Sequence, residues 1–366
     1  MTALTRRSLL IGATSALAAK PLLSIAAPSD SLRASMFRRA LICEVPFLPP
    51  AVQDNITERV YPQGLALDAT ERELFIFYSY LKKNPEFGTL CCVYDTESLR
   101  LKSWFRTPEL CRESFVFRRV GQSRRVYTVG LDSPLFYDVT RLPPAGASLD
   151  PEQIFRPEQR SYAQLAWTGK EFVYMSGERD EQRRKGKQRF IRADAVFRQT
   201  GTVDFPLGVV GSYDKAQVLH YPKAQGVAYT KGMFLFSCGK NYARSGRGRE
   251  EDPLLPSTQQ GLIACDPDGR RLADALVSPD FALAQFGKMA GRSLQMIENE
   301  SITASGGGAV ALWQTCHPSQ WATDGRKSGL LVTEEMSGAR AAVDFSEGAV
   351  SLNEVMRRDL NRSLPD

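Results

Sequence analysis

The segment Gln63-Gly64-Leu65-Ala66-Leu67-Asp68 decides the fold, together with the apolar runs at residues 74–78 and 90–95 that follow it. Its apolar residues alternate with the period of two that is typical of a half-buried strand. Turn residues separate it from the two apolar runs, LFIFY and LCCVYD. The sequence therefore predicts three short strands joined by turns between residues 63 and 95.

Four similar segments follow further along the chain. A polar or small pair followed by apolar-x-apolar-x recurs at residues 113–118, 163–168, 225–230 and 300–305. A second strand follows each of the five copies after a turn, at residues 74–78, 125–129, 172–175, 233–237 and 309–314. A repeat of about 40 to 50 residues with several strands is typical of a propeller blade. We therefore expect an all-β, five-bladed β-propeller over residues 57–345, with six blades or a β-sandwich as the alternatives.

Two of the repeats are longer than the others because of insertions. Residues 178–187 are a polar hairpin, and residues 241–260 are rich in Gly, Arg, Ser and Pro. Such composition predicts solvated connections. Residues 281–296 are expected to form a helix.

The first residues predict an export signal. Arg6 and Arg7 precede a short, small-residue apolar run, and residues 16–18 and 24–26 each offer a small-x-small cleavage site. A membrane anchor needs about 20 strongly apolar residues, more than this run supplies. We therefore interpret residues 1–26 as a signal read by the twin-arginine export machinery. The mature protein is then expected in the periplasm or outside the cell, with no transmembrane anchor.

The segments that flank the blades have simpler predictions. Residues 27–56 contain one candidate strand, at residues 34–45, which would close the ring against the last blade. The tail at residues 346–366 contains a short basic amphipathic helix, expected to be solvated.

Composition narrows the class of partner. A hydrophobic content of 43% and a charged content of 24% are ordinary for a globular protein. The net charge of +6 is mild and no nucleic-acid-binding motif occurs, so nucleic acid is not an expected partner. The seven cysteines follow no metal-binding spacing. Cys238 and Cys265 are predicted to lie on neighbouring strands of one blade. The sequence is compatible with a disulfide between them and with two buried free thiols.

The candidate site is the central channel, which the first strand of each blade lines in a propeller. The polar residues that open these strands are Gln63, Glu113, Gln164, Gln225 and Glu300. A ring of amides and carboxylates can bind a hydrated cation or a sugar hydroxyl; the alternative is that it holds only channel water. The three glutamines are therefore candidate ligand-binding residues.

The two glutamates of this ring have further interpretations. Glu113 and Glu300 are candidate ligands for calcium, which takes 6 to 8 oxygen ligands. They are also a candidate acid and base, because glycoside cleavage uses two carboxyl groups. The chain has only two histidines and no Gly-x-Ser-x-Gly motif, so the sequence favours no other catalytic arrangement.

Two resemblances accompany these residues. The blade openings at residues 63–66 and 225–228, with third strands that end at Asp95 and Asp266, resemble exported five-bladed propellers of the teichoic acid biosynthesis protein C-like and phage receptor-binding families. This resemblance implies non-catalytic binding of a glycan or another anionic envelope polymer. The openings at residues 113–114 and 300–301 resemble calcium-activated nucleotidase (apyrase) propellers, which implies a central calcium.

The preferred prediction is an exported propeller that binds a glycan or another anionic envelope ligand on its channel face without catalysis. The alternatives are a calcium-assisted hydrolase of phosphate esters or glycosides, and a protein-interaction scaffold. Fold class alone does not choose among them.

Overall fold

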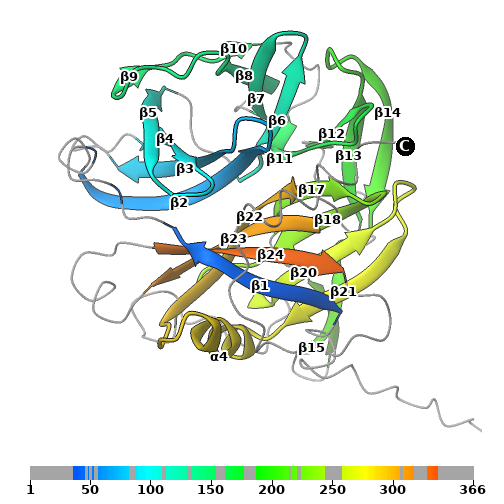
Figure 1. Ribbon diagram of the computed structural model, residues 1–366. Coiled ribbons are helices and arrows are strands. Elements are labelled where there is room, and N and C mark those ends of the chain that lie inside the picture. Colours follow the sequence, from blue (N-terminus) through cyan, green and yellow to red (C-terminus); the bar gives the residue numbers. More distant parts are fainter. Residues whose placement is uncertain are drawn as a thin grey trace, which may run out of the picture.

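The structure, a computed structural model, describes residues 36–45, 48, 52, 57–81, 87–108, 113–129, 134–153, 161–176, 187–213, 216–220, 224–243, 258–305, 308–316 and 328–336. The predicted export signal, the C-terminal tail and Cys111 lie outside these residues. The described strands form six sheets, and the five larger ones are arranged around one axis (Figure 1). The five-bladed β-propeller predicted from the repeats is thus confirmed.

The first three blades follow one another along the chain. Blade 1 consists of β2 (Thr57–Asp68), β3 (Glu73–Leu81), β4 (Phe87–Asp95) and β5 (Leu101–Thr107), with the short β9 (Ala147–Ser148) beside β5. Blade 2 consists of β6 (Val116–Val120), β7 (Ser123–Val129), β8 (Pro134–Asp138) and β10 (Glu152–Gln153). Blade 3 consists of β11 (Ser161–Trp167), β12 (Phe172–Ser176), β13 (Gln188–Ala193) and β14 (Gln199–Phe205).

The last two blades carry additional elements. Blade 4 consists of β17 (Ala224–Thr230), β18 (Met233–Cys238), β20 (Gln260–Cys265) and β21 (Arg271–Val277). Blade 5 consists of β22 (Met296–Ser305), β23 (Gly308–Cys316), β24 (Ser328–Met336) and β1 (Phe37–Glu44), with β19 (Tyr242–Ala243) on its inner edge. The hairpin of β15 (Val209–Tyr213) and β16 (Ala216–His220) lies between blades 3 and 4 along the chain and does not make a sixth blade.

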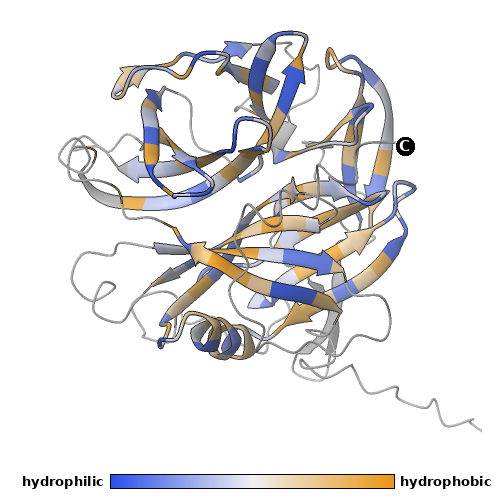
Figure 2. Cartoon of the chain, viewed as in Figure 1, coloured by the Kyte–Doolittle hydropathy of each residue, from blue (hydrophilic) through white to orange (hydrophobic). Residues whose placement is uncertain are grey.

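Five apolar cores hold the ring together. Alternation along a strand sends neighbouring side chains to opposite sides, and Figure 2 shows the apolar and polar bands that result. On β3, for example, Phe77 faces blade 2, where its ring stacks on Phe115 with centroids 3.7 Å apart. Its neighbour Ile76 faces blade 5. A strand in the middle of a blade therefore serves two cores.

The ring closes between the N-terminal and C-terminal strands of blade 5. β1, which lies within the segment of the candidate closing strand, pairs antiparallel with β24 from Phe37 opposite Met336 to Glu44 opposite Leu330. A buried ion pair lies across this pairing, with Arg39 Nε 2.8 Å from Glu334 Oε2. Trp313 donates to the same carboxylate at 3.3 Å. Two segments at opposite ends of the described chain thus complete one blade.

The helix α4 (Pro279–Met289) covers blade 5 and is shorter than the sequence predicts. Phe286 packs on Trp313 with ring centroids 4.2 Å apart. The helix ends because Gly291 adopts a φ of 64°, a left-handed conformation that glycine reaches without strain. Met296, expected in the helix, instead begins β22. Among the described residues, none of the helices is long and apolar enough to span a membrane.

The disulfide considered between Cys238 and Cys265 is not formed. Cys265 pairs with Phe234 and Cys238 with Gly261, so the register places the two cysteines several residues apart along the blade. All six described cysteines are free thiols. Burial raises the pKa of Cys265 to about 12 and that of Cys238 still further. Of the two interpretations, buried free thiols are therefore correct for these residues.

Candidate functional site

The two ends of the channel differ in the connections that surround them. Connections between the first and second strands of the blades are only two to four residues long, at residues 69–72, 121–122, 168–171, 231–232 and 306–307. At the other end, where the inner strands begin, three connections are much longer, at residues 177–187, 239–259 and 317–327, and two are short, at residues 82–86 and 130–133. Variable connections on a rigid scaffold are where binding residues concentrate. The end with long connections is therefore the better place for a site.

Two carboxylates and one amide meet at this end of the channel. Gln225 Nε2 on β17 donates to Glu298 Oε1 at 2.7 Å and to Glu300 Oε2 at 3.1 Å, both on β22. The three side chains belong to residues that are 1%, 5% and 3% exposed. Glu300 is the extra residue of a bulge, since Asn299 pairs with Trp313 and Ser301 pairs with Leu312, which leaves Glu300 without an opposite residue on β23. A bulge re-aims side chains and is common beside active sites.

A second amide lies beside this cluster. Gln164 on β11 is 2% exposed, and its Nε2 donates to the carbonyl of Ala224, the residue before Gln225. The side-chain oxygens of Gln164 and Gln225 are both buried without a hydrogen-bond partner among the described residues. Buried polar atoms of this kind are rare in native proteins and need an explanation.

The residues before β6 contact the inner strands of blades 4 and 5. Ser301 Oγ donates to the carbonyl of Glu113, and the Val227 amide donates to Ser114 Oγ at 3.2 Å. Ser114 is fully buried. The sequence predicts that Glu113 opens an inner strand, but β6 begins only at Val116. The preceding residues instead contact blades 4 and 5, and Glu113 contacts β22 through its backbone carbonyl.

Gln63 is the member of the predicted ring that stays within its own blade. Its Oε1 accepts a hydrogen bond from Ser79 on the neighbouring strand β3. Gln314 of blade 5 instead contacts blade 1, donating to the carbonyl of Pro62 at 2.6 Å. The structure thus brings Gln164, Gln225 and Glu300 together, Glu113 through its main chain, and leaves Gln63 apart. Their roles in binding ligand stay predictions.

Sequence reasoning misses Glu298 because it aligns the repeat from Glu300. The strand β22 begins four residues earlier, at Met296. Residues two apart on a strand lie on the same side, so the spacing of Glu298 and Glu300 is the signal that could have found it.

The opposite end of the channel holds a small cavity of about 110 Å³. All five inner strands contribute to its lining, which includes Leu67, Phe115, Ala166, Trp167, Val227, Tyr229 and Thr303. Arg118 lies beside it, with its guanidinium carbon 3.5 Å from the centroid of the Trp167 ring.

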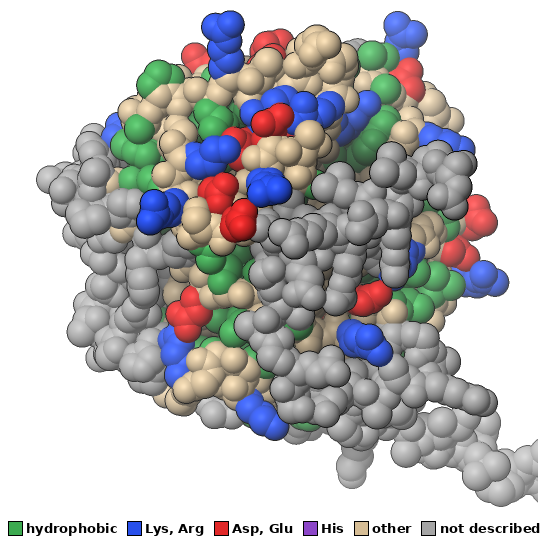
Figure 3. All heavy atoms as spheres, viewed as in Figure 1, with side chains coloured by type: hydrophobic (Ala, Val, Ile, Leu, Met, Phe, Trp, Pro, Cys, Tyr) green, Lys and Arg blue, Asp and Glu red, His purple; other side chains and the backbone are tan. Residues whose placement is uncertain are grey.

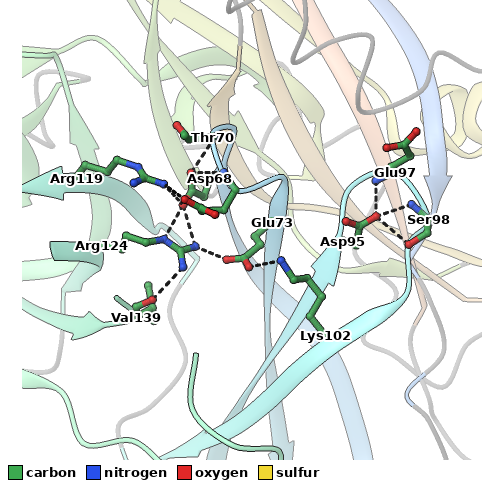
Figure 4. A network of polar contacts seen from close by, with 11 residues as sticks. Asp68, Thr70, Glu73, Asp95, Glu97, Ser98, Lys102, Arg119, Arg124 and Val139 are labelled. Atoms are coloured by element: carbon green, nitrogen blue, oxygen red, sulfur yellow. Dashed lines mark hydrogen bonds and ion pairs between the residues drawn. The ribbon is translucent and has the colours of Figure 1, made fainter. Parts of the chain in front are cut away.

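A charged cluster near the short connections joins blades 1 and 2. Arg124 of blade 2 donates to Asp68 at 2.9 Å and also contacts Glu73 of blade 1 (Figure 4). Lys102 contacts the other oxygen of Glu73, and Arg119 lies 2.7 Å from Glu71. Since each carboxylate has a basic partner, this network stabilises the interface between blades 1 and 2.

A metal ion finds few ligands in the part of the chain that the structure describes. No three His, Cys, Asp or Glu side chains gather there. A calcium ion at Glu300 would depend on Glu298 and on the amide oxygens of Gln164 and Gln225, since calcium takes 6 to 8 oxygens. This donor set is compatible with a cation but does not complete its coordination.

Comparisons with known proteins give only distant similarity. No family model matches the chain, and no curated protein matches it. Among solved structures, the tail fibre of Staphylococcus aureus phage P68 is similar at 8% identity and a TM-score of 0.48, over 90% of this chain and 56% of the fibre. This chain thus spans little more than half the length of that protein.

Two glycoside hydrolases are similar at the same level. The catalytic domain of the Coprinopsis cinerea GH62 α-L-arabinofuranosidase has 8% identity and a TM-score of 0.46, over 84% of this chain and 99% of that one. A glycosyl hydrolase from Bacteroides ovatus has 11% identity and a TM-score of 0.43, over 83% and 92%. These similarities are too distant to transfer an activity, so function must be argued from the channel itself.

Proposed function

We propose that the protein binds a glycan at the carboxylate end of the channel, without catalysis. The observation that carries the proposal is the buried cluster of Glu298, Gln225 and Glu300, at the end surrounded by long connections. Sugar hydroxyls are hydrogen-bond donors, and carboxylate and amide oxygens accept from them. A few converging polar groups are what fixes the orientation of a ligand in a small-molecule site.

The charge of the cluster favours a glycan over an anionic polymer. Two carboxylates at the centre of the site repel phosphate or uronate groups. On the face drawn in Figure 3, several of the described Lys and Arg side chains have acidic side chains beside them. Electrostatic attraction of a polyanion depends on a surface of a single sign of charge. The ligand is therefore expected to be neutral or positively charged at the point where it enters the channel.

Calorimetric titration with a panel of envelope and plant oligosaccharides tests this function. Gln225→Ala should lower the affinity for the best ligand at least tenfold, because the amide holds both carboxylates in place. Gln199→Ala is the matched control, since Gln199 is exposed on the outer strand β14. Circular dichroism establishes that each variant is folded. Unchanged affinity in folded Gln225→Ala would place the ligand on the long connections and overturn the channel proposal.

A second candidate function is hydrolysis of glycosides or phosphate esters. The favouring observation is that one nitrogen binds both carboxylates, so by the sum of the two bond lengths the bound oxygens are no more than about 6 Å apart. Retaining glycosidases hold their carboxyl groups about 5–5.5 Å apart and inverting enzymes about 6.5–9.5 Å apart. The geometry favours Glu298, rather than Glu113, as the partner of Glu300. Turnover that persists in Glu300→Gln would exclude this assignment.

Calcium dependence separates the two candidates further. A ligand that binds only the native state raises the melting temperature by mass action. A saturable rise with calcium, reversed by chelator, would favour the hydrolase and direct the search to phosphate esters. An unchanged melting temperature would favour the non-catalytic function.

We also propose that residues 1–26 direct export through the twin-arginine route. The support is the pair Arg6 and Arg7 before a short apolar run. Replacing both arginines by lysine should leave the protein in the cytoplasm, whereas replacing Lys20 should not. Secretion of the double variant at the normal level would argue against this route.

A further inference from the structure

Two arginines are direct neighbours where blade 2 meets blade 3, at the end of the channel with the short connections. Arg118 on β6 pairs with Arg125 on β7. Opposite residues of an antiparallel pair share one face of the sheet, and like charges in this position destabilise it. Arg118 shows which face this is, because its guanidinium carbon lies 3.5 Å from the centroid of the Trp167 ring of blade 3. Two positive charges therefore lie side by side in this interface.

Neither arginine has a counter-ion among the described residues. Arg118 and Arg125 form no ion pair there, and Arg118 Nη1 and Arg125 Nε are buried without a hydrogen-bond partner. Asp138 lies opposite Arg125 on β8, but its carboxylate accepts from the Thr140 amide at 2.9 Å and forms no ion pair with either arginine. Arg124, by contrast, contacts two carboxylates of blade 1. The pair thus retains positive charge and hydrogen-bond donors that an anion would satisfy.

The cavity of about 110 Å³ lies beside this pair. Trp167, on which Arg118 stacks, lines it, and so does Val116, which is two residues from Arg118 and on the same face of β6. Ala304 also lines the cavity and is exposed, so the cavity is open to solvent. An engineered cavity of about 150 Å³ in another protein holds benzene. This one therefore has room for a somewhat smaller apolar group.

We infer that this place binds a small organic carboxylate, with its oxygens on Arg118 and Arg125 and its short apolar chain in the cavity. The guanidinium group presents its N–H donors in a planar fork that matches a carboxylate. The negative charge also relieves the repulsion between the two arginines. The chain gains from leaving water for the apolar walls.

Other small ligands satisfy only part of this arrangement. Inorganic phosphate would pair with the arginines and leave the cavity without an apolar occupant. A neutral apolar molecule would fill the cavity and leave both guanidinium groups without a counter-charge, and a cation would be repelled by them. The carboxylate site lies at the other end of the channel from Gln225 and Glu300, so the inference does not depend on the proposed glycan binding.

Butyrate and butyramide, which share one chain and differ in charge, test this inference. Each is titrated calorimetrically into the full-length mature protein. We expect butyrate to bind about tenfold more tightly, because hydrogen bonds to charged groups are the stronger ones. Arg118→Gln and Arg125→Gln should each bring this ratio close to one. Arg141→Gln is the control, because Arg141 is an exposed arginine that follows β8. Ala304→Leu narrows the cavity from an exposed position and should weaken butyrate severalfold while leaving acetate unchanged.

Several outcomes would overturn the inference. Equal affinity of the wild-type protein for butyrate and butyramide, or no binding of either, would remove the carboxylate site. A preference for butyrate that survives in folded Arg118→Gln and Arg125→Gln would place the carboxylate elsewhere. Phosphate binding as tight as that of butyrate, unaffected by Ala304→Leu, would leave an anion site without a role for the cavity. If both arginine variants fail to fold, Ala304→Leu still decides, since unchanged butyrate affinity in it contradicts the inference. Oligosaccharide titration tests glycan binding separately.

Discussion

Arg39 and Glu334 form a buried ion pair between the first and the last described strands of the chain, with Nε and Oε2 2.8 Å apart. Their side chains are 1% and 0% exposed. The pair lies across the pairing of β1 with β24, where the two ends of the described chain meet within one blade.

Removing Arg39 should destabilise the ring strongly. Arg39→Met leaves the Glu334 carboxylate buried without its counter-charge, which costs about 3–5 kcal/mol in comparable pairs. Lys231→Met is the control, because Lys231 pairs with the adjacent Glu335 at 2.9 Å on the surface. Exposed pairs contribute about 0–1 kcal/mol. Urea unfolding at pH 8 measures both free energies of unfolding, and equal losses would contradict a special role for the buried pair.

The stability of the same blade should depend on pH through Glu334. Burial raises the pKa of this carboxyl group, although Arg39 opposes the shift. Since the folded pKa lies above the unfolded value of about 4.3, the stabilising contribution is complete below that value and declines as pH rises through the folded pKa. Glu334→Gln lacks this dependence. The wild-type protein should therefore exceed Glu334→Gln in free energy of unfolding by less at pH 8 than at pH 4.

Urea titrations of both proteins across this range provide the measurement. A difference that grows with pH would mean that attraction by Arg39 outweighs burial and that the pKa of Glu334 is lowered. The Glu334→Gln variant has no titrating group at this position, so the comparison isolates the carboxyl group from the other acids of the chain.

The buried cysteines should be unreactive in the native protein. Burial raises the pKa values of Cys43, Cys92 and Cys265 to about 12, and the thiolate is the reactive form. At pH 8 we expect Ellman's reagent to label the six described cysteines only slowly. In guanidinium chloride all seven thiols of the chain should titrate. A loss of two thiols from that count in the unfolded, unreduced protein would reveal a disulfide and contradict the structure.

Gly226 should tolerate no side chain. A Cβ there would lie 3.0 Å from the Ile302 nitrogen and 3.3 Å from Ser301 Cα on the facing strand. Overpacking of this kind costs about 1–3 kcal/mol, and shifting β22 should also weaken glycan binding. Gly201→Ala is the control, since nothing lies within 4 Å of a Cβ at that position. Equal melting temperatures for the two variants would show that the inner strands can separate freely.

The architecture could be predicted from the sequence because blades are local. Each repeat is a set of adjacent antiparallel strands, so alternation and turns within some 50 residues predict it. The second strands lie where the repeat places them, from Glu73–Leu81 to Gly308–Cys316. The insertion at residues 241–260 is expected to be a loop only, yet β19 within it pairs with β22.

The site is harder to predict because it depends on register and on crossings between blades. When the repeats are aligned with Glu300 as the first residue of the last copy, Glu298 lies outside the repeat and is missed. Nothing in the local sequence indicates that Glu113 and Ser114 contact β22 and β17. The bulge at Glu300 is likewise a property of the pairing with β23 and not of the strand alone. Distant contacts of this kind leave no periodic signal.

The pairing of β1 with β24 also determines when the protein can finish folding. Arg39 and Glu334 are 295 residues apart in sequence, so β1 leaves the ribosome long before its partner is synthesised. Until then blade 5 is incomplete, and an unpaired strand edge is exposed to other chains. Long-range pairing of this kind slows folding and prolongs exposure to aggregation. A stalled or truncated nascent chain should therefore depend on chaperones in a way that the completed ring does not.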